Sequence, residues 1–371
     1  MQDGLLDSAI AARRVQTATG LDVHYLEAGA ADAPLLVLLH GFPELAFSWR
    51  KVMVPLADLG YRVVAPDQRG YGQTTGWVDG FEGDVDSYRL VALARDALAL
   101  VSALGRPEAA AVIGHDFGSP VGQTAALIRP DVFRACVMMS APVPSPSALP
   151  LGPYQAPNGR DVHADLRALD RPRKHYQWYY STRTAATDML APPEGLHAFL
   201  RAYYHMKSAD WAANRPAPLA AWSAKDLAWL PDYYVMGADQ TMPEAVRASM
   251  PTADEIAAQA WLTDDELGVY ADAFRATGFQ APLTWYRCQT EGRNAADLAM
   301  FAGCKLQVPT AFIAGASDWG VHQVPGALAA MECAGSVDYR GTTLIEGAGH
   351  WVQQEQPDAV VTALSSFLKS L

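Results

Sequence analysis

The chain has 371 residues, of which 50% are hydrophobic and 18% are charged. A chain this apolar can bury a core, so we exclude a disordered protein. Its 28 Lys and Arg against 40 Asp and Glu give a net charge of −12, which disfavours nucleic acid and anionic membranes as partners, because their phosphates require a basic surface.

The first 143 residues alternate between apolar runs and amphipathic segments. Continuous apolar runs predict strands buried on both faces, and apolar residues at helical spacing predict the segments between them. The expected strands are 21–27, 35–39, 61–65, 109–113 and 133–139, and the expected helices are 49–59, 86–104 and 119–128. This alternation predicts a mostly parallel α/β sheet, whose ligand site lies beyond the carboxyl ends of its strands.

The residue pattern changes between Pro142 and Pro157, where six prolines predict a stiff connector. The stretch 161–293 is rich in Trp, Tyr and Ala, shows no buried-strand run, and has helical spacing at 196–206 and 264–277. We interpret it as a helical insertion.

The alternation of strand and helix patterns resumes after residue 308. The expected strands are 309–314 and 337–344, and the expected helices are 321–331 and 357–371. We therefore expect one α/β core built from residues 1–143 and 298–371, with a helical cap and its proline-rich connector at 144–297.

The cysteines and the first residues of the chain indicate the cellular compartment. The four cysteines have no metal-ligand spacing, and the first residues lack the basic start and apolar run of a signal peptide. The longest apolar runs are far shorter than the ~20 residues of a membrane helix. We expect a cytoplasmic protein without a metal or a membrane span, either a monomer or a homodimer.

The strongest chemical signal is Gly114-His115-Asp116-Phe117-Gly118, between a predicted buried strand and a helix. Glycines two residues on each side of a central residue are typical of a sharp turn that presents that residue at the top of a sheet. A carboxylate here attacks saturated carbon and forms an alkyl ester. The alternative is that Asp116 only caps the following helix.

The segment His40-Gly41-Phe42-Pro43-Glu44 follows another buried strand. A loop at this place can direct the N–H of Phe42 to the same point as the N–H of Phe117, which predicts an oxyanion hole. Taken alone, this segment is equally typical of an ordinary turn that contains proline.

An acid and a base follow the last two predicted strands, at the edge that carries Asp116. Asp318 lies in Gly315-Ala316-Ser317-Asp318, and His350 lies in a glycine-rich segment at 347–351. The order nucleophile, acid, histidine is that of the α/β-hydrolase triad. A carboxylate beside the histidine holds its tautomer and stabilises its charged form, a role that Asp318 is placed to fill.

Together these motifs resemble the α/β-hydrolase superfamily and, within it, the epoxide hydrolases. The resemblance covers nearly the whole chain and is carried by HGFPE at 40–44, SWR at 48–50, APDQRGYG at 65–72, GHDFG at 114–118, GASDWG at 315–320 and GAGHW at 347–351. It implies an α/β-hydrolase fold with an inserted helical cap, an Asp nucleophile, a small apolar epoxide as substrate, and no cofactor.

Two cap segments narrow the resemblance, HYQWY at 175–179 and GFQAPLTWYR at 278–287. In epoxide hydrolases two cap tyrosines bind the epoxide oxygen, and the resemblance assigns this role to Tyr176 and Tyr286. Tyr179 and Tyr180 lie close enough in the sequence to replace Tyr176.

Five further residues are predicted to contact the substrate or the hydrolytic water: His40, Pro43, Glu44, His115 and Trp178. Glu44 and His115 either orient the water or stabilise loops by hydrogen bonds. Several cap tryptophans favour a bulky apolar pocket.

Two other functions remain open. A haloalkane dehalogenase also uses an Asp nucleophile, but the side chains of Phe42 and Phe117 have no N–H with which to bind halide. The second is a hydrolase-fold protein that binds a ligand without catalysis, and a turnover assay would distinguish it from an enzyme.

Overall fold

The computed structural model describes residues 4–143, 146, 149 and 161–371. The described residues form an eight-stranded sheet in the order β1-β2-β4-β3-β5-β6-β9-β10. β2 pairs antiparallel with β1 and β4, and the other neighbours pair parallel. The strands are β1 (Ala11–Gln16), β2 (Asp22–Ala28), β3 (Leu35–Leu39), β4 (Arg62–Pro66), β5 (Ala111–His115), β6 (Cys136–Met139), β9 (Thr310–Gly315) and β10 (Tyr339–Ile345).

The sheet is covered by helices on both faces, which explains the continuous apolar run of β3. Leu35, Val37 and Leu39 join one buried cluster, and Leu36 and Leu38 join the other. The first cluster includes side chains of α2 (Leu90–Ala103), α3 (Gly118–Ile128) and α14 (Ala327–Ala334). The second includes side chains of α1 (Arg50–Asp58) and α16 (Pro357–Lys369). This is the α/β-hydrolase architecture that the sequence predicts.

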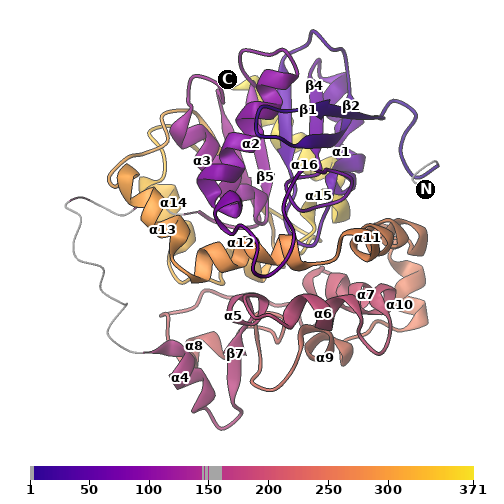
Figure 1. Ribbon diagram of the computed structural model, residues 1–371, viewed down its shortest axis with the longest axis vertical. Coiled ribbons are helices and arrows are strands. Elements are labelled where there is room, and N and C mark those ends of the chain that lie inside the picture. The colour runs from indigo at the N-terminus through magenta and orange to yellow at the C-terminus, as the bar shows by residue number, and fades with distance from the viewer. Residues whose placement is uncertain (1–3, 144–145, 147–148, 150–160) are drawn as a thin grey trace.

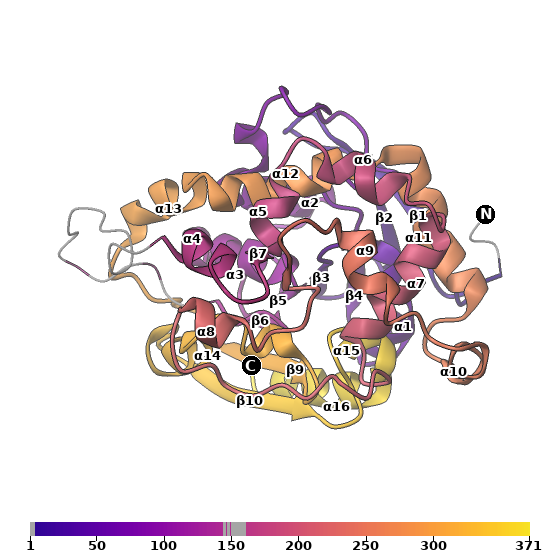
Figure 2. The ribbon, with the colours of Figure 1, turned by 90° about the horizontal axis from the view of Figure 1, so that it is seen from below.

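The middle of the chain forms a separate helical layer beneath the sheet in Figure 1 and in front of it in Figure 2. A two-stranded sheet of β7 (Arg173–His175) and β8 (Val235–Gly237) lies among its helices. These helices are α4 (Val162–Arg167), α5 (Tyr176–Tyr180), α6 (Ala185–Leu190), α7 (Leu196–Lys207), α8 (Ala224–Leu227), α9 (Met242–Arg247), α10 (Ala253–Ala258), α11 (Asp264–Thr277), α12 (Gln280–Thr290) and α13 (Arg293–Leu298).

The structure corrects two of the expected helices and adds three strands. The helix expected at 321–331 begins only at Ala327, because Gly326 has a left-handed φ of 75°. The helix expected at 86–104 is a short turn at Asp86–Tyr88 followed by α2. β1 and the β7–β8 pair were not expected. The proline-rich connector lies largely outside the described residues, and the core and cap boundaries stay a prediction.

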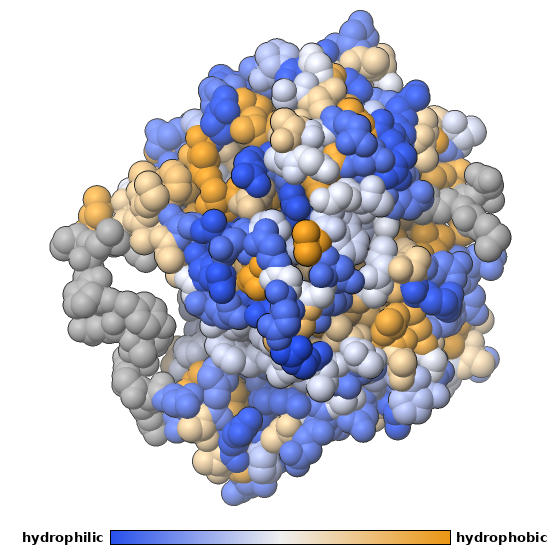
Figure 3. All heavy atoms as spheres, viewed as in Figure 1, coloured by the Kyte–Doolittle hydropathy of each residue, from blue (hydrophilic) through white to orange (hydrophobic). Residues whose placement is uncertain are grey.

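The expectation of no membrane span concerns the exposed surface and the helices. Figure 3 shows polar side chains over most of one face, with apolar side chains in small separated groups. Within the described ranges, no helix combines the length and apolar character that crossing a membrane requires.

Candidate active site

The nucleophile candidate lies on the sharp turn that its glycines predict. β5 ends at His115, α3 begins at Gly118, and Asp116 between them has a φ of 50°. A non-glycine residue in this region is strained, and such strain accumulates at functional sites. Gly118 is required because a Cβ there would lie 2.2 Å from the carbonyl oxygen of Leu39. The turn is therefore held tightly against the end of β3.

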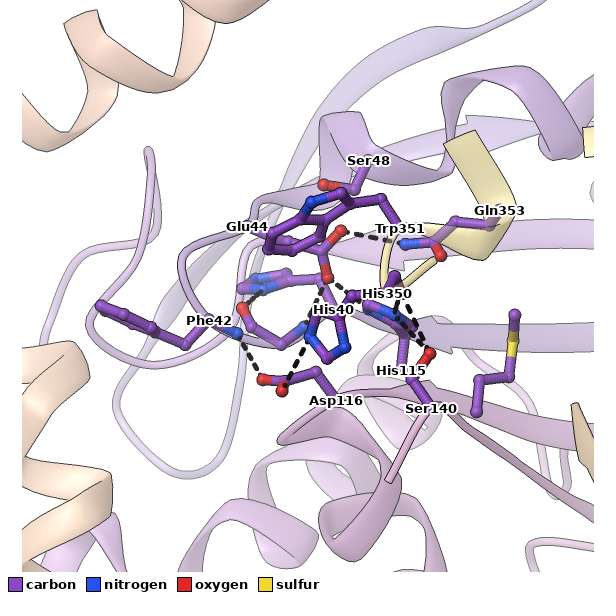
Figure 4. A network of polar contacts seen from close by, with 12 residues as sticks. His40, Phe42, Glu44, Ser48, His115, Asp116, Ser140, His350, Trp351 and Gln353 are labelled. Atoms are coloured by element: carbon purple, nitrogen blue, oxygen red, sulfur yellow. Dashed lines mark hydrogen bonds and ion pairs between the residues drawn. The ribbon is translucent and has the colours of Figure 1, made fainter. Parts of the chain in front are cut away.

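The three members of the predicted triad come together (Figure 4 shows two of them). His350 Nε2 lies 3.2 Å from Asp116 Oδ2, and His350 Nδ1 lies 3.1 Å from both carboxylate oxygens of Asp318. The backbone N–H of Gly320 donates to Asp318 Oδ1 at 2.6 Å. The imidazole is therefore placed between the two carboxylates, with Asp318 fixed from behind.

Both triad carboxyls are held ionised by their surroundings. Burial raises the pKa of Asp116, but the hydrogen bond and charge of His350, and then the charge of Lys207, hold it well below its usual range. Burial likewise raises the pKa of Asp318, and the charge of His350 and its hydrogen bond, followed by Lys207, hold it below its usual range. Asp116 is thus an anion at neutral pH, as a nucleophile must be.

One of the two predicted oxyanion donors contacts Asp116 directly. The backbone N–H of Phe42 donates to Asp116 Oδ1 at 2.9 Å. Gly41 permits this approach, because a Cβ there would lie 2.3 Å from the Cβ of Asp116. The ring of Phe117 packs against Tyr286, with ring centres 5.2 Å apart. The role of the Phe117 N–H stays a prediction.

Both predicted cap tyrosines share a cavity with Asp116, the predicted nucleophile. The cavity has a volume of about 410 Å³ and is lined by Asp116, Tyr176 and Tyr286 among others. The hydroxyl of Tyr179 instead donates to Asp188 at 3.0 Å, and that of Tyr180 donates to Tyr203 at 3.3 Å. Of the three candidate tyrosines on α5, Tyr176 is therefore the one that lines this cavity.

The two cavity tyrosines differ in how their hydroxyls are bonded. Tyr176 donates to Gln323 Oε1 at 3.3 Å and accepts from Gln177 Nε2 at 3.2 Å. No hydrogen bond from Tyr286 to another described residue is present. Burial, and then the charge of Asp116, raise the pKa of both phenols well above the usual value. Both phenols are consequently protonated and able to donate.

Among the described residues that line the cavity, only Asp116 is charged. The other described lining side chains are apolar, aromatic or amide groups supplied by the core, by α5, α12 and α13, and by the segments that follow β6 and α13. Within the described residues, no cluster of His, Cys, Asp or Glu has the geometry of a metal site. The arrangement accommodates a neutral apolar molecule next to a carboxylate.

The five predicted contacts to substrate or water lie outside the lining of this cavity. His40 Nδ1 lies 2.8 Å from the carbonyl of Gly41, and its Nε2 accepts from the N–H of Gln68 at 3.1 Å. The carbonyl of Pro43 accepts from Tyr204 at 2.9 Å. These residues fix the loop that carries Phe42.

Trp178 and the Glu44–His115 pair are also placed elsewhere. Trp178 packs on His163, with ring centres 4.0 Å apart. Glu44 Oε2 lies 2.6 Å from His115 Nδ1, and His115 Nε2 lies 2.7 Å from the carbonyl of His350. Figure 4 shows Glu44 and His115 beside Asp116. Because His115 bonds the carbonyl of His350, the pair supports the loop that carries His350.

The sequence motifs did not reveal Lys207, Gln177 or Gln323. Gln177 and Gln323 both bond Tyr176, and Lys207 is buried beside His350. None of the three belongs to a glycine-bounded motif, and Lys207 ends an amphipathic helix where a lysine is ordinarily exposed. Only the packing of the cap on the core brings them to the site.

A nucleophile turn, an acid and a histidine at the ends of parallel strands define an α/β hydrolase. The family model for the alpha/beta hydrolase fold matches residues 34–178. Epoxide hydrolase B of Mycobacterium tuberculosis is 31% identical over 368 residues, which cover 96% of this chain and 98% of that protein. Epoxide hydrolase A of the same organism is 32% identical over 358 residues, covering 96% and 97%.

Solved structures agree with these relatives. An epoxide hydrolase from an endophytic Streptomyces matches with a TM-score of 0.76 and 29% identity, covering 98% of this chain and 96% of that one. Epoxide hydrolase A from Mycobacterium thermoresistibile matches with a TM-score of 0.75 and 32% identity, covering 97% and 98%. The chain belongs to the epoxide hydrolase family and is an enzyme of the hydrolase class.

Proposed function

We propose that this enzyme opens small apolar epoxides to vicinal diols through an alkyl ester on Asp116. The observation that carries the proposal is one cavity that holds an ionised aspartate, with His350 Nε2 3.2 Å away, and two protonated tyrosines. An epoxide opens when its carbon is attacked and its oxygen receives a proton. The cavity contains one group for each of these tasks.

In the first step a carboxylate oxygen of Asp116 bonds to a ring carbon, and the carbon–oxygen bond of the epoxide breaks. Tyr286 gives its proton to the departing oxygen and becomes a phenolate, while the O–H of Tyr176 turns from Gln323 to hydrogen-bond the same oxygen. We assign the proton to Tyr286 because the hydroxyl of Tyr176 already donates to Gln323. The product of this step is a hydroxyalkyl ester.

In the second step His350 takes a proton from water, and the hydroxide adds to the carboxyl carbon of Asp116. The N–H groups of Phe42 and Phe117 hold the resulting oxyanion. When this intermediate collapses, the bond to the diol oxygen breaks and that oxygen takes the proton from His350. The second proton of the water returns to Tyr286, so the enzyme is restored and one water is consumed.

The ester is tested by a single turnover in heavy-oxygen water, with epoxides of the styrene, stilbene and aliphatic types. We expect label in Asp116 first and in the diol only after a second turnover. Label that enters the diol directly would exclude the ester. His350→Gln should accumulate the ester in acid-quenched mass spectra, whereas His322→Gln, a control at a histidine outside the triad, should not.

The same assay separates the two rival functions. A haloalkane dehalogenase would release halide from chloroalkanes, and a binding protein would yield neither halide nor diol. We expect diol alone, because no described side chain lining the cavity next to Asp116 carries a halide-binding indole N–H.

A further inference from the structure

A buried lysine lies beside the triad without an anionic partner. Lys207, at the end of α7, is 3% exposed. No carboxylate of the described residues lies within ion-pair distance of its ammonium. A buried charge that is not paired costs several kcal/mol, so its presence at this position requires a reason.

Aromatic rings take the place of the missing carboxylate. The ammonium lies 5.3 Å from the ring centres of Tyr234 and Trp351, 5.4 Å from that of Tyr203 and 5.8 Å from that of Tyr233. Aromatic faces attract a cation without neutralising it. The positive charge is therefore stabilised and still acts on its surroundings.

The surroundings on which it acts are the triad. The carbonyl of Lys207 accepts the N–H of His350 at 2.8 Å, and Trp351, which packs on the ammonium, is the next residue in the chain. The lysine charge also reaches both triad carboxyls, where it adds to the effect of His350. Lys207 is absent from the cavity lining, so it acts behind the reacting atoms.

We propose that Lys207 is a positioning residue whose ammonium offsets the two carboxylates that face His350, so that the imidazole can return to its neutral form in each cycle. The proposal rests on the proposed function, in which His350 must accept a proton from water. The imidazole lies between two carboxylates, at 3.1 and 3.2 Å, and nearby anions favour the charged form of a base. A permanently charged imidazole cannot act as the base.

The other charged groups around His350 do not supply the positive charge that offsets the two carboxylates. Glu44 is paired with His115 below the His350 loop. Glu355 accepts the N–H groups of Gly349 and Trp351, and burial, the largest effect, raises its pKa to about 8. Of His115 and Lys207, two described basic residues that contact His350, only Lys207 has no carboxylate within ion-pair distance.

The experiment compares Lys207→Met with Lys174→Met, in the pH dependence of kcat and KM. Lys174 is the matched control, because its ammonium also lies over a tyrosine ring, 4.9 Å from the ring centre of Tyr179. Without the Lys207 charge the imidazolium is favoured, so the base becomes neutral only at higher pH. We expect the acid limb of kcat to move up by about one pH unit, the equivalent of a tenfold change.

Three further readouts complete the test. Below the limb, kcat of Lys207→Met should fall about tenfold while KM stays unchanged, and the ester should accumulate. Lys207→Arg should restore the wild-type profile, because it keeps the charge, and Lys174→Met should not move it. A folded Lys207→Met enzyme with the wild-type acid limb would overturn the proposal.

Two measurements keep the test decisive. If Lys207→Met does not fold, Lys207→Gln is measured in the same way, and NMR of lysine-labelled wild type reports the charge of Lys207. A neutral Lys207 within the pH range of the acid limb would overturn the proposal. Absence of the ester in wild type would instead overturn the proposed function, so the two failures are distinguishable.

Discussion

Substitution of Glu44 by glutamine tests whether this carboxylate supports the fold or acts on water. Glu44 has no exposed surface, and it accepts from His115 Nδ1 at 2.6 Å and from Gln353 Nε2 at 2.9 Å. The N–H of Gly41 donates to it at 3.2 Å. Glutamine preserves the volume and removes the charge, so the protein is left with His115 buried without its anion.

The magnitude follows from this burial. Breaking one partner of a buried ion pair costs about 3–5 kcal/mol. A chain of this length has an unfolding entropy of about 0.8 kcal/mol per degree, so Glu44→Gln should lower Tm by about 4–6 °C. Because His115 also holds the carbonyl of His350 at 2.7 Å, we expect kcat to fall about tenfold at unchanged KM.

The pH dependence gives a second, independent readout. Burial raises the pKa of Glu44, but the charge and hydrogen bond of His115 bring it below its usual 4.5. Its contribution is therefore present above pH 4.5 and is lost as the pH falls through the folded pKa. Burial lowers the pKa of His115, and the charge of Glu44 raises it above its usual 6.5, so that contribution is lost as the pH rises through the folded pKa.

The assay is calorimetry between about pH 4 and 9, spanning the usual pKa values of both groups, with the exposed Glu346→Gln as control. Glu44→Gln should lose both of these slopes, and the control should keep them. An unchanged Tm together with a collapse of kcat would refute the structural reasoning and assign Glu44 to the hydrolytic water instead.

Three other substitutions test the cavity. Tyr286→Phe should slow ester formation in stopped-flow by about 10²–10⁴, and an intact rate would remove Tyr286 from the mechanism. Gln323→Leu should change ester formation by less than about tenfold, and this change should vanish in a Tyr176→Phe background; persistence there would show that Gln323 acts independently. Gly41→Ala should abolish turnover, because its Cβ would lie 2.4 Å from the nucleophile's Oδ1, whereas Gly268→Ala, with open space around it, should remain active.

The sequence predicts the core of this enzyme well because local chemistry determines it. The alternation of strands and helices predicts where the strands end. Glycine-rich turns at those ends predict the positions of Asp116, Asp318 and His350. The fold class follows from the same alternation. β1 escapes prediction because four of its six residues, Ala12, Arg13, Arg14 and Gln16, are exposed, so its sequence lacks the apolar run that marks a buried strand.

Long-range packing explains what the sequence could not predict. Which tyrosine of α5 lines the cavity depends on the rotation of one five-residue helix, and no spacing rule fixes that rotation. Lys207 lies at a helix end, where a lysine ordinarily reaches solvent, and only the fold of Tyr233, Tyr234 and Trp351 around it makes it buried. Glu44 and His115 belong to motifs, but their partners come from distant segments.

Two hydrogen bonds attach the helical layer to loops of the core. Trp285, which precedes Tyr286, donates its indole N–H to the carbonyl of Arg69 at 3.2 Å. Tyr204 donates to Pro43, next to the oxyanion donor Phe42. The first attachment lies next to Tyr286 on α12, and the second lies next to Phe42 on a core loop. Because buried hydrogen bonds and packed aromatic rings resist displacement, these two attachments fix α7 and α12 against the core loops. α12 carries Tyr286, the proton donor of the proposed mechanism.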